Sequence, residues 1–221
     1  MSEEQQNYTM DQNEFLKRMK AIASDLWGGT LPTEETAPAA DRPKEPAKPR
    51  TDDRKKTSLI ALWKTADETI DWTDALGHDT PTDGLTSLKK WAFYHKHAKK
   101  VLEGDLAAYT EVLQKANPLG ELTEYAENIT MQAHSADRLE STFICNAELL
   151  EQHKELYLAA MGLRIARDLL ACLPVEEVAV TGDREGKQVF AVTYTRQQLL
   201  HRNFVFTDPV ALAKECGAEF K

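Results

Sequence analysis

The segment from residue 148 to residue 172 constrains the fold more than any other part of the sequence. A helix on the surface of a domain buries one apolar stripe and keeps polar residues on its other faces. The second half of this segment holds too many large apolar side chains for one stripe: Leu156, Met161, Leu163, Ile165, Leu169 and Leu170. The sequence therefore predicts a long helix at the centre of the core, which ends before Pro174.

Two charged residues interrupt this apolar run. Arg164 and Asp168 are four residues apart, so they share one side of a helix. We expect them to form an ion pair on the exposed side. The alternative is that Arg164 enters a polar pocket between the helix and a sheet.

Short alternating segments before and after this helix predict two β-hairpins. Apolar and polar residues alternate in residues 129–133 and 139–145, on either side of a turn at 135–138. The same pattern recurs in residues 178–194, around the charged turn GDREGK. A period of two residues is typical of half-buried strands.

The remaining patterns are helical and complete the predicted fold. Residues 86–103 and 106–116 are joined at a glycine and predict an antiparallel helical hairpin, and two short helices close the chain at 196–201 and 209–216. Because the strands come as hairpins and not as β-α-β crossovers, we expect an α+β fold. Its antiparallel sheet of two hairpins would pack on the long central helix, preceded by the helical hairpin.

Residues 1–28 contain an amphipathic pattern that predicts an N-terminal helix. Apolar residues recur with helical spacing and form one stripe: Phe15, Met19, Ile22, Leu26 and the adjacent Trp27. We expect this stripe to bind a partner protein or a second copy of the chain. Docking onto the protein's own domain is the alternative.

The residues that follow divide into a linker and a domain. Residues 29–56 contain five of the nine prolines, alternating charges and no aromatic residue, which predicts a disordered linker that tethers the helix. We expect a short helix and a loop over residues 57–82, and a compact α+β domain over residues 83–221.

Composition and charge limit the classes of function. The 221 residues carry a net charge of −9, which disfavours non-specific nucleic-acid binding by the chain as a whole. No apolar run approaches the roughly 20 residues of a membrane-spanning helix, and the acidic start lacks the features of a signal peptide. We therefore expect a cytoplasmic protein with no membrane partner. The three cysteines lack metal-binding spacing and are expected to be structural thiols.

Two groups of residues have the composition of a catalytic or metal site but not its geometry. Asp183, Glu185 and Lys187 resemble the acid and Glu-x-Lys set of metal-dependent nucleases, but they lie within five residues at a hairpin tip. His95 and His97 would point about 200° apart on a helix, so they cannot bind one ion together. We assign no catalytic residue, metal, cofactor or small-molecule substrate.

A basic segment stands out in this acidic chain. Residues 86–102 hold five lysines and no acidic residue, with Trp91, Phe93 and Tyr94 interleaved; the lysines are Lys89, Lys90, Lys96, Lys99 and Lys100. We expect a core stripe through Leu88, Trp91 or Ala92, His95, Ala98 and Leu102, with the lysines on its solvated side. The alternative is an anionic ligand, either nucleic acid or an acidic protein.

Three blocks resemble a conserved region of uncharacterised bacterial proteins, labelled only as a domain of unknown function. They are WAFYHKHAKKVLEGDLAAYTEVLQKANPLGELTEY, LRIARDLLACLPVEEVAV and FAVTYTRQQLLHRNFVFTDPVALAKECG, so the resemblance covers residues 91–217. It implies a bacterial, cytosolic origin and a β-β-α-β-β core, and it carries over no functional residue. The chain departs from the family in its N-terminal segment and in the shorter turn at 183–187.

These observations predict a non-enzymatic interaction or regulatory module that docks a macromolecular partner, with a protein or a second copy of the chain as that partner. One alternative is nucleic-acid binding through the helix at 89–100. The second alternative is a metal-dependent nuclease-like enzyme at the 183–187 turn.

Overall fold

The computed structural model describes residues 58–65, 69–84 and 86–221. The amphipathic stripe predicted in residues 1–28 and the linker predicted in residues 29–56 lie outside the described residues. Their assignments as a partner-binding helix and a tether stay predictions.

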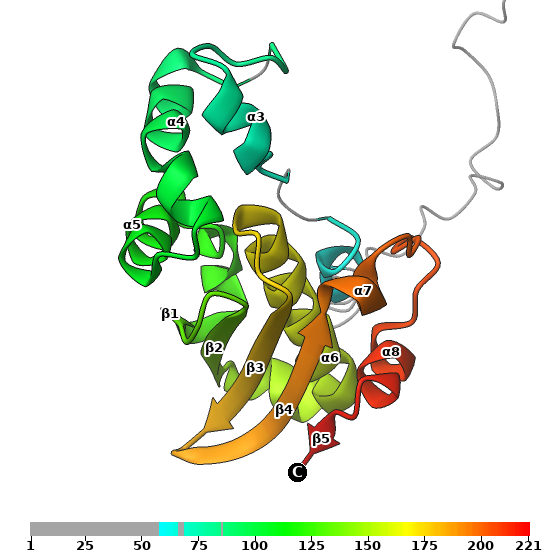
Figure 1. The fold of residues 1–221 in the computed structure, drawn as a ribbon. Helices are drawn as coiled ribbons and strands as arrows, with labels where there is room; N and C mark the ends of the chain where they lie inside the picture. The colour runs from blue at the N-terminus through cyan, green and yellow to red at the C-terminus, as the bar shows by residue number, and fades with distance from the viewer. Residues whose placement is uncertain (1–57, 66–68, 85) are drawn as a thin grey trace, which may run out of the picture. The chain divides into compact units, whose positions relative to one another are not determined.

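A five-stranded sheet organises the described chain, as Figure 1 shows. The strands lie in sequence order across the sheet: β1 Ala126–Ala133, β2 Arg138–Cys145, β3 Glu177–Arg184, β4 Lys187–Thr195 and β5 Glu219–Phe220. Strands β1 and β2 form one antiparallel hairpin and β3 and β4 form the other, which confirms the α+β class and both predicted hairpins. The two-residue strand β5 pairs with β4 and was not predicted.

The pairing between the two hairpins differs from the prediction. Strands β2 and β3 are parallel, with Leu139 opposite Val178, so a sheet that is antiparallel throughout is wrong at this pair. The reason is the helix α6, Ala147–Cys172, which connects the two strands. The helix is kinked at His153, and its part after the kink, residues 154–172, is roughly 29 Å long at about 1.5 Å per residue, which is enough to span an eight-residue strand of about 26 Å. The helix therefore returns the chain to the end of the sheet where β2 began, and the hairpins are joined by a β-α-β crossover.

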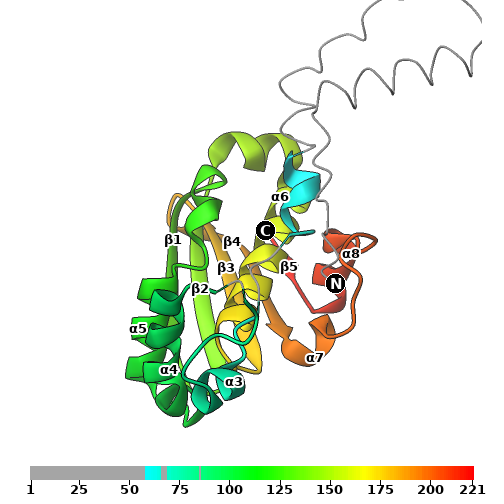
Figure 2. The same ribbon diagram turned by 90° about the horizontal axis from the view of Figure 1, so that it is seen from above.

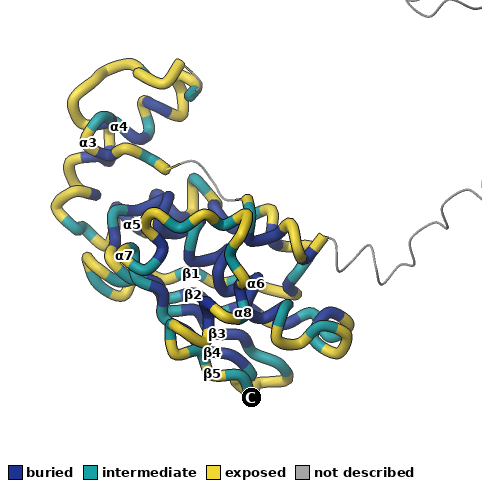
Figure 3. Tube along the Cα trace, turned by 90° about the vertical axis from the view of Figure 1, so that its right-hand side faces the viewer, coloured by how far each residue is buried: buried dark blue, intermediate teal, exposed yellow. Residues whose placement is uncertain are grey.

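Helix α6 packs on one face of the sheet, and this contact is the centre of the core. Residues 157–166 of α6 are all buried, as the predicted central helix requires. The strands present buried Phe143, Val180 and Phe190 to this face, while the residues between them stay partly exposed. Figure 2 shows the part of α6 after the kink lying along the strands, and Figure 3 shows buried positions gathered where they meet.

Shorter helices surround this core. They are α3 Trp72–Gly77, α4 Leu88–Leu102, α5 Leu106–Ala116, the 3-10 turn η1 Gly120–Glu124, α7 Arg196–Leu199 and α8 Pro209–Glu215. Asp105 caps α5 and Asp208 caps α8, each by accepting a hydrogen bond from a backbone N–H of the first turn. None of the helices in the described ranges combines the length and the apolar character that a membrane crossing requires.

The core also includes residues before position 83, where the sequence predicted only a short helix and a loop. Residues 58–62 are helical, and Leu59, Leu62 and Trp63 are buried in the common core. Helix α3 was not predicted, and its Trp72 Nε1 donates a hydrogen bond to the Cys172 carbonyl at 3.0 Å. The domain boundary expected at residue 83 is therefore too late.

Candidate functional site

Helix α4 carries the basic segment and has clear signals at both ends. The Ser87 hydroxyl accepts a hydrogen bond from the Lys90 N–H, and the helix stops before Gly104, whose φ of 77° favours glycine. Its buried residues are Trp91, Tyr94, His97, Ala98 and Val101.

The core stripe expected on α4 is therefore displaced around the helix. Leu88 is 68% exposed and Leu102 is 42% exposed, although both were expected in the core. The cause is that α4 packs against two helices. The Tyr94 ring meets Trp72 of α3 edge-on at 5.5 Å, and His97 Nε2 lies 3.1 Å from Glu111 Oε2 of α5.

Four lysines form what we call the lysine face of α4: Lys89, Lys96, Lys99 and Lys100. All four are exposed, and at 100° per residue Lys89, Lys96 and Lys100 fall within about 40° of one another around the helix axis. Lys99 lies about 60° to one side of these three, and Lys90 lies about 80° to the other side, with its Nζ 5.7 Å from the centre of the Tyr94 ring.

A pocket of about 220 Å³ lies where the start of α4 meets the end of α5. We call it the α4–α5 pocket; its polar and aromatic lining consists of Ser87, Lys89, Lys90, Phe93, Tyr94 and Lys115. Lys115 was not among the predicted residues. The predicted helical hairpin could have revealed it. In an antiparallel pair the last turn of the second helix lies beside the first turn of the first helix.

The electrostatic character of this pocket is positive. Within the described residues, Lys99 pairs with Glu103 at 3.9 Å, whereas Lys89, Lys90 and Lys115 make no ion pair. Like charges on lysines that line one hollow repel one another, and a bound anion relieves that repulsion. The arrangement is therefore suited to binding a negatively charged group.

The two histidines of α4 point to different helices. His95 Nδ1 lies 2.7 Å from the Ala75 carbonyl oxygen of α3, whereas His97 lies against Glu111 and meets the Phe93 ring at 4.4 Å. Burial lowers the pKa of His97, and Glu111 opposes that shift. Their side chains are thus directed apart, as the helical spacing predicts.

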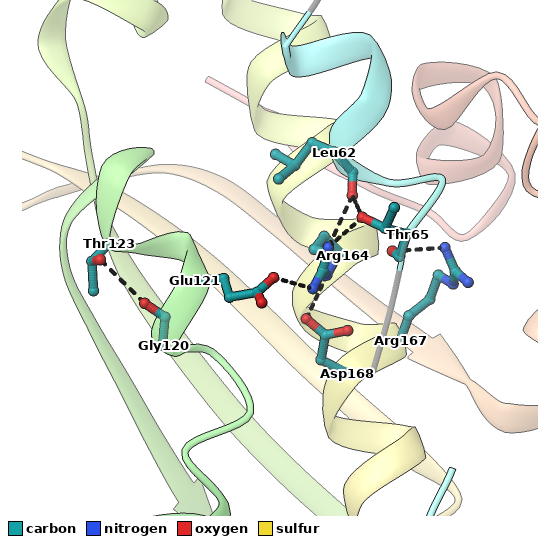
Figure 4. A network of polar contacts seen from close by, with 8 residues as sticks. All are labelled: Leu62, Thr65, Gly120, Glu121, Thr123, Arg164, Arg167 and Asp168. Carbon is teal, nitrogen blue, oxygen red and sulfur yellow. Dashed lines mark hydrogen bonds and ion pairs between the residues drawn. The ribbon is translucent and has the colours of Figure 1, made fainter. Parts of the chain in front are cut away.

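Arg164 and Asp168 form a buried ion pair, not the surface pair that we expected. Arg164 Nε donates to Asp168 Oδ2 at 2.6 Å, and the two side chains are 5% and 0% exposed. Figure 4 shows Arg164 facing residues from three parts of the chain. It also donates to Thr65 Oγ1 at 2.6 Å and lies 3.5 Å from Glu121 Oε2. The residues before α3 supply partners that the sequence pattern did not reveal.

Arg167, three residues further along α6, also binds the segment around Thr65. The Arg167 Nη1 donates to the backbone carbonyls of Trp63 and Thr65, and its guanidinium stacks on the Phe204 ring at 3.8 Å. Both arginines donate hydrogen bonds to residues between Leu62 and Thr65. This network therefore holds the residues around Thr65 on α6, and we interpret it as structural.

A larger hollow of about 690 Å³ shares Lys90 and Tyr94 with the α4–α5 pocket. It contains three aspartates, but local structure already engages each of them. Asp71 accepts the Asp74 N–H at 2.9 Å, Asp74 pairs with His78 at 2.7 Å, and Asp83 accepts the Thr86 N–H at 2.9 Å. These carboxylates therefore cap and close turns.

The turn at 183–187 is the tip of the second hairpin. Glu185 and Gly186 form the turn with φ values of 53° and 74°. Asp183 and Glu185 border a hollow with Glu127, but Arg184 lies among them and donates to Glu127 Oε1 at 2.8 Å. In the described ranges no three His, Cys, Asp or Glu side chains are grouped so as to hold a metal. The nuclease-like alternative gains no support from this geometry.

Comparison of the chain with protein-family models, with curated proteins and with solved structures gives no match. The resemblance of residues 91–217 to a region of uncharacterised bacterial proteins stays a prediction.

Proposed function

We propose that this protein is a non-enzymatic interaction module that docks a macromolecular partner, and that the lysine face of α4 is a docking surface. One observation carries the proposal. A chain with a net charge of −9 presents four exposed lysines on one helix face that has no acidic residue between its first and last lysine. Such a local reversal of charge steers an oppositely charged partner to one surface.

The chemistry of the surface favours an acidic protein as the partner. Binding of single-stranded nucleic acid relies on aromatic rings that are free to stack on bases. Trp91 is 6% exposed and Tyr94 is 5% exposed, so two of the three interleaved aromatics belong to the core. Lysines without stacking rings are suited to carboxylates, which need only charge and hydrogen-bond donors.

The proposal includes the N-terminal segment and the cellular location. We infer that the apolar stripe from Phe15 to Trp27 supplies a second docking element, or a contact with a second copy of the chain. We place the module in the cytoplasm. The three cysteines form no disulfide, which supports a reducing compartment, because disulfides are rare there.

Affinity purification of the tagged full chain from host extract tests the docking surface. Changing Lys96 and Lys100 to Glu should reduce recovery of the partner that the wild-type chain binds by at least about tenfold. The reason is that two lysines that attract an acidic partner become two carboxylates that repel it. The matched control changes Lys154 and Lys187, two exposed lysines outside α4, to Glu. It therefore has the same net charge as the Lys96 and Lys100 variant. Equal recovery with the two variants would refute a role for the lysine face.

Nucleic-acid binding is the second candidate, and Phe93 is the observation that favours it. This ring is only partly buried and lines the α4–α5 pocket among lysines, so one base could stack on it. Binding of a single-stranded oligonucleotide should then weaken steeply with salt and with Phe93→Ala. Binding that is unchanged by salt and by Phe93→Ala would exclude nucleic-acid binding through this surface.

A further inference from the structure

The α4–α5 pocket has more positive charge than a single carboxylate requires. Three lysines, Lys89, Lys90 and Lys115, line this one hollow together with Ser87. A carboxylate brings one negative charge, whereas a phosphate monoester brings about −1.5 to −2 at neutral pH and three acceptor oxygens. The number of donors and charges matches the phosphoryl group better.

We propose that the α4–α5 pocket binds a phosphoryl group carried by a serine or threonine of the protein partner. The inference rests on the proposed function for the identity of the partner, but the pocket itself is independent of the lysine face beyond Lys89. In this arrangement the lysine face attracts an acidic segment, and the pocket binds a phosphorylated residue within it.

The size of the pocket supports a phosphorylated side chain over a whole nucleotide. Its volume is about 220 Å³, below the roughly 300 Å³ at which small-molecule sites begin. The rings of Phe93 and Tyr94 form apolar walls beside the lysines. The pocket therefore has room for one anionic group but not for the rest of a large ligand.

The position of Lys115 gives the pocket its selectivity. Lys89 and Lys90 begin α4, whereas Lys115 lies in the last turn of α5, so the three lysines that line the pocket come from two helices. A phosphoryl group offers acceptor oxygens in three directions and can meet donors from both helices. A lysine pair on one helix could not surround it in this way.

Titration of the full chain with inorganic phosphate tests the pocket directly. Backbone amide shifts are followed by NMR at constant ionic strength, with chloride as the balancing anion. We expect saturable shifts confined to residues 87–94 and 115–116. Lys89→Gln with Lys115→Gln should weaken this binding by at least about tenfold, the factor that corresponds to 1.4 kcal/mol.

The matched control is Lys96→Gln with Lys99→Gln, which removes the same charge from the lysine face outside the pocket. It should leave phosphate affinity within about twofold of wild type, because screening weakens distant exposed charges. Both pairs of lysines are exposed, so both variants should keep the wild-type melting temperature. Shifts that do not saturate, or equal weakening in the two variants, would overturn the proposal.

The source of the phosphoryl group is tested with three probes: an acidic peptide with one phosphoserine, the same peptide with serine, and a 5′-phosphorylated oligonucleotide. We expect the phosphopeptide to bind the most tightly and to lose this advantage in the pocket variant alone. Tighter binding of the oligonucleotide would overturn the assignment to a protein partner. Failure of the lysine-face test with intact phosphate binding would instead refute the proposed docking surface and leave the pocket standing.

Discussion

Arg164 and Asp168 lie one turn apart on α6 and form an ion pair, with 2.6 Å between Nε and Oδ2, although neither side chain is more than 5% exposed. Removing two charges from water costs free energy. This cost is offset by their mutual attraction and by hydrogen bonds to their remaining polar atoms. The Thr65 hydroxyl supplies one of these bonds to Arg164. The pair therefore connects the start of the described chain to the central helix.

Loss of one member of this pair should be costly. Asp168→Ala leaves the buried guanidinium without its carboxylate and should lower the free energy of unfolding by about 3–5 kcal/mol. Urea denaturation of the full chain measures this change. The double variant Arg164→Met with Asp168→Leu should lose less than Asp168→Ala, because no buried charge is left unpaired. A loss below about 0.5 kcal/mol in Asp168→Ala would contradict the buried pair.

The sequence predicted the elements of this fold better than their contacts. Periodicity located the strands of both hairpins and the helix α6, because each buries a face whose spacing the side chains must follow. The pairing of β2 with β3 could not be read in the same way, since it depends on where a 26-residue helix returns the chain. The burial of Arg164 also depended on residues about a hundred positions away in the sequence.

The candidate site shows the same division between local and distant information. The lysines of α4 were found because they lie in one helix with no acid among them. Lys115 was missed, because its relevance appears only when α5 folds back beside α4. The core stripe of α4 was displaced because two helices, α3 and α5, share the burial of its surface.

Gly162 of α6 should tolerate no larger residue. A Cβ atom at this position would lie 2.7 Å from Phe190 Cε1 in the facing strand. Gly162→Ala should therefore destabilise the fold by about 1–3 kcal/mol, although alanine favours a helix by about 1 kcal/mol over glycine. Thermal unfolding measures the change. Gly77→Ala is the matched control, because nothing lies within 4 Å of its added Cβ, and a stabilised Gly162→Ala would disprove the close contact.

His97 should make stability depend on pH. Its folded pKa is below the ordinary value of 6.5 because burial disfavours the charged ring, so the unfolded chain binds a proton at a higher pH. The stabilisation is fully present above about pH 6.5 and is lost as the pH falls toward the folded pKa. Wild type should therefore lose stability more steeply than His97→Gln between about pH 7 and pH 5. Parallel curves in urea denaturation would contradict this role.

The three thiols should differ in reactivity. Cys145 is fully buried, and desolvation raises its pKa to about 12, while Cys172 is also buried. Cys216 is partly exposed, and burial raises its pKa as well. Because the thiolate is the reactive form, a thiol reagent at about pH 8 should modify Cys216 first and slowly. Mass spectrometry should find the other two modified only in urea, and early labelling of Cys145 would contradict its burial.

The tip of the second hairpin should accept substitutions that improve its turn. Glu185 has a φ of 53°, which most side chains adopt only at a cost, whereas asparagine followed by glycine is the preferred pair in two-residue hairpin turns. Its ion pair with Arg184 spans 3.9 Å at an exposed position and contributes little. Glu185→Asn should therefore raise the free energy of unfolding by up to about 1 kcal/mol in urea denaturation. Gly186→Ala should lower it, because its φ of 74° strains any residue with a Cβ. A destabilised Glu185→Asn would contradict the backbone cost assigned to this turn.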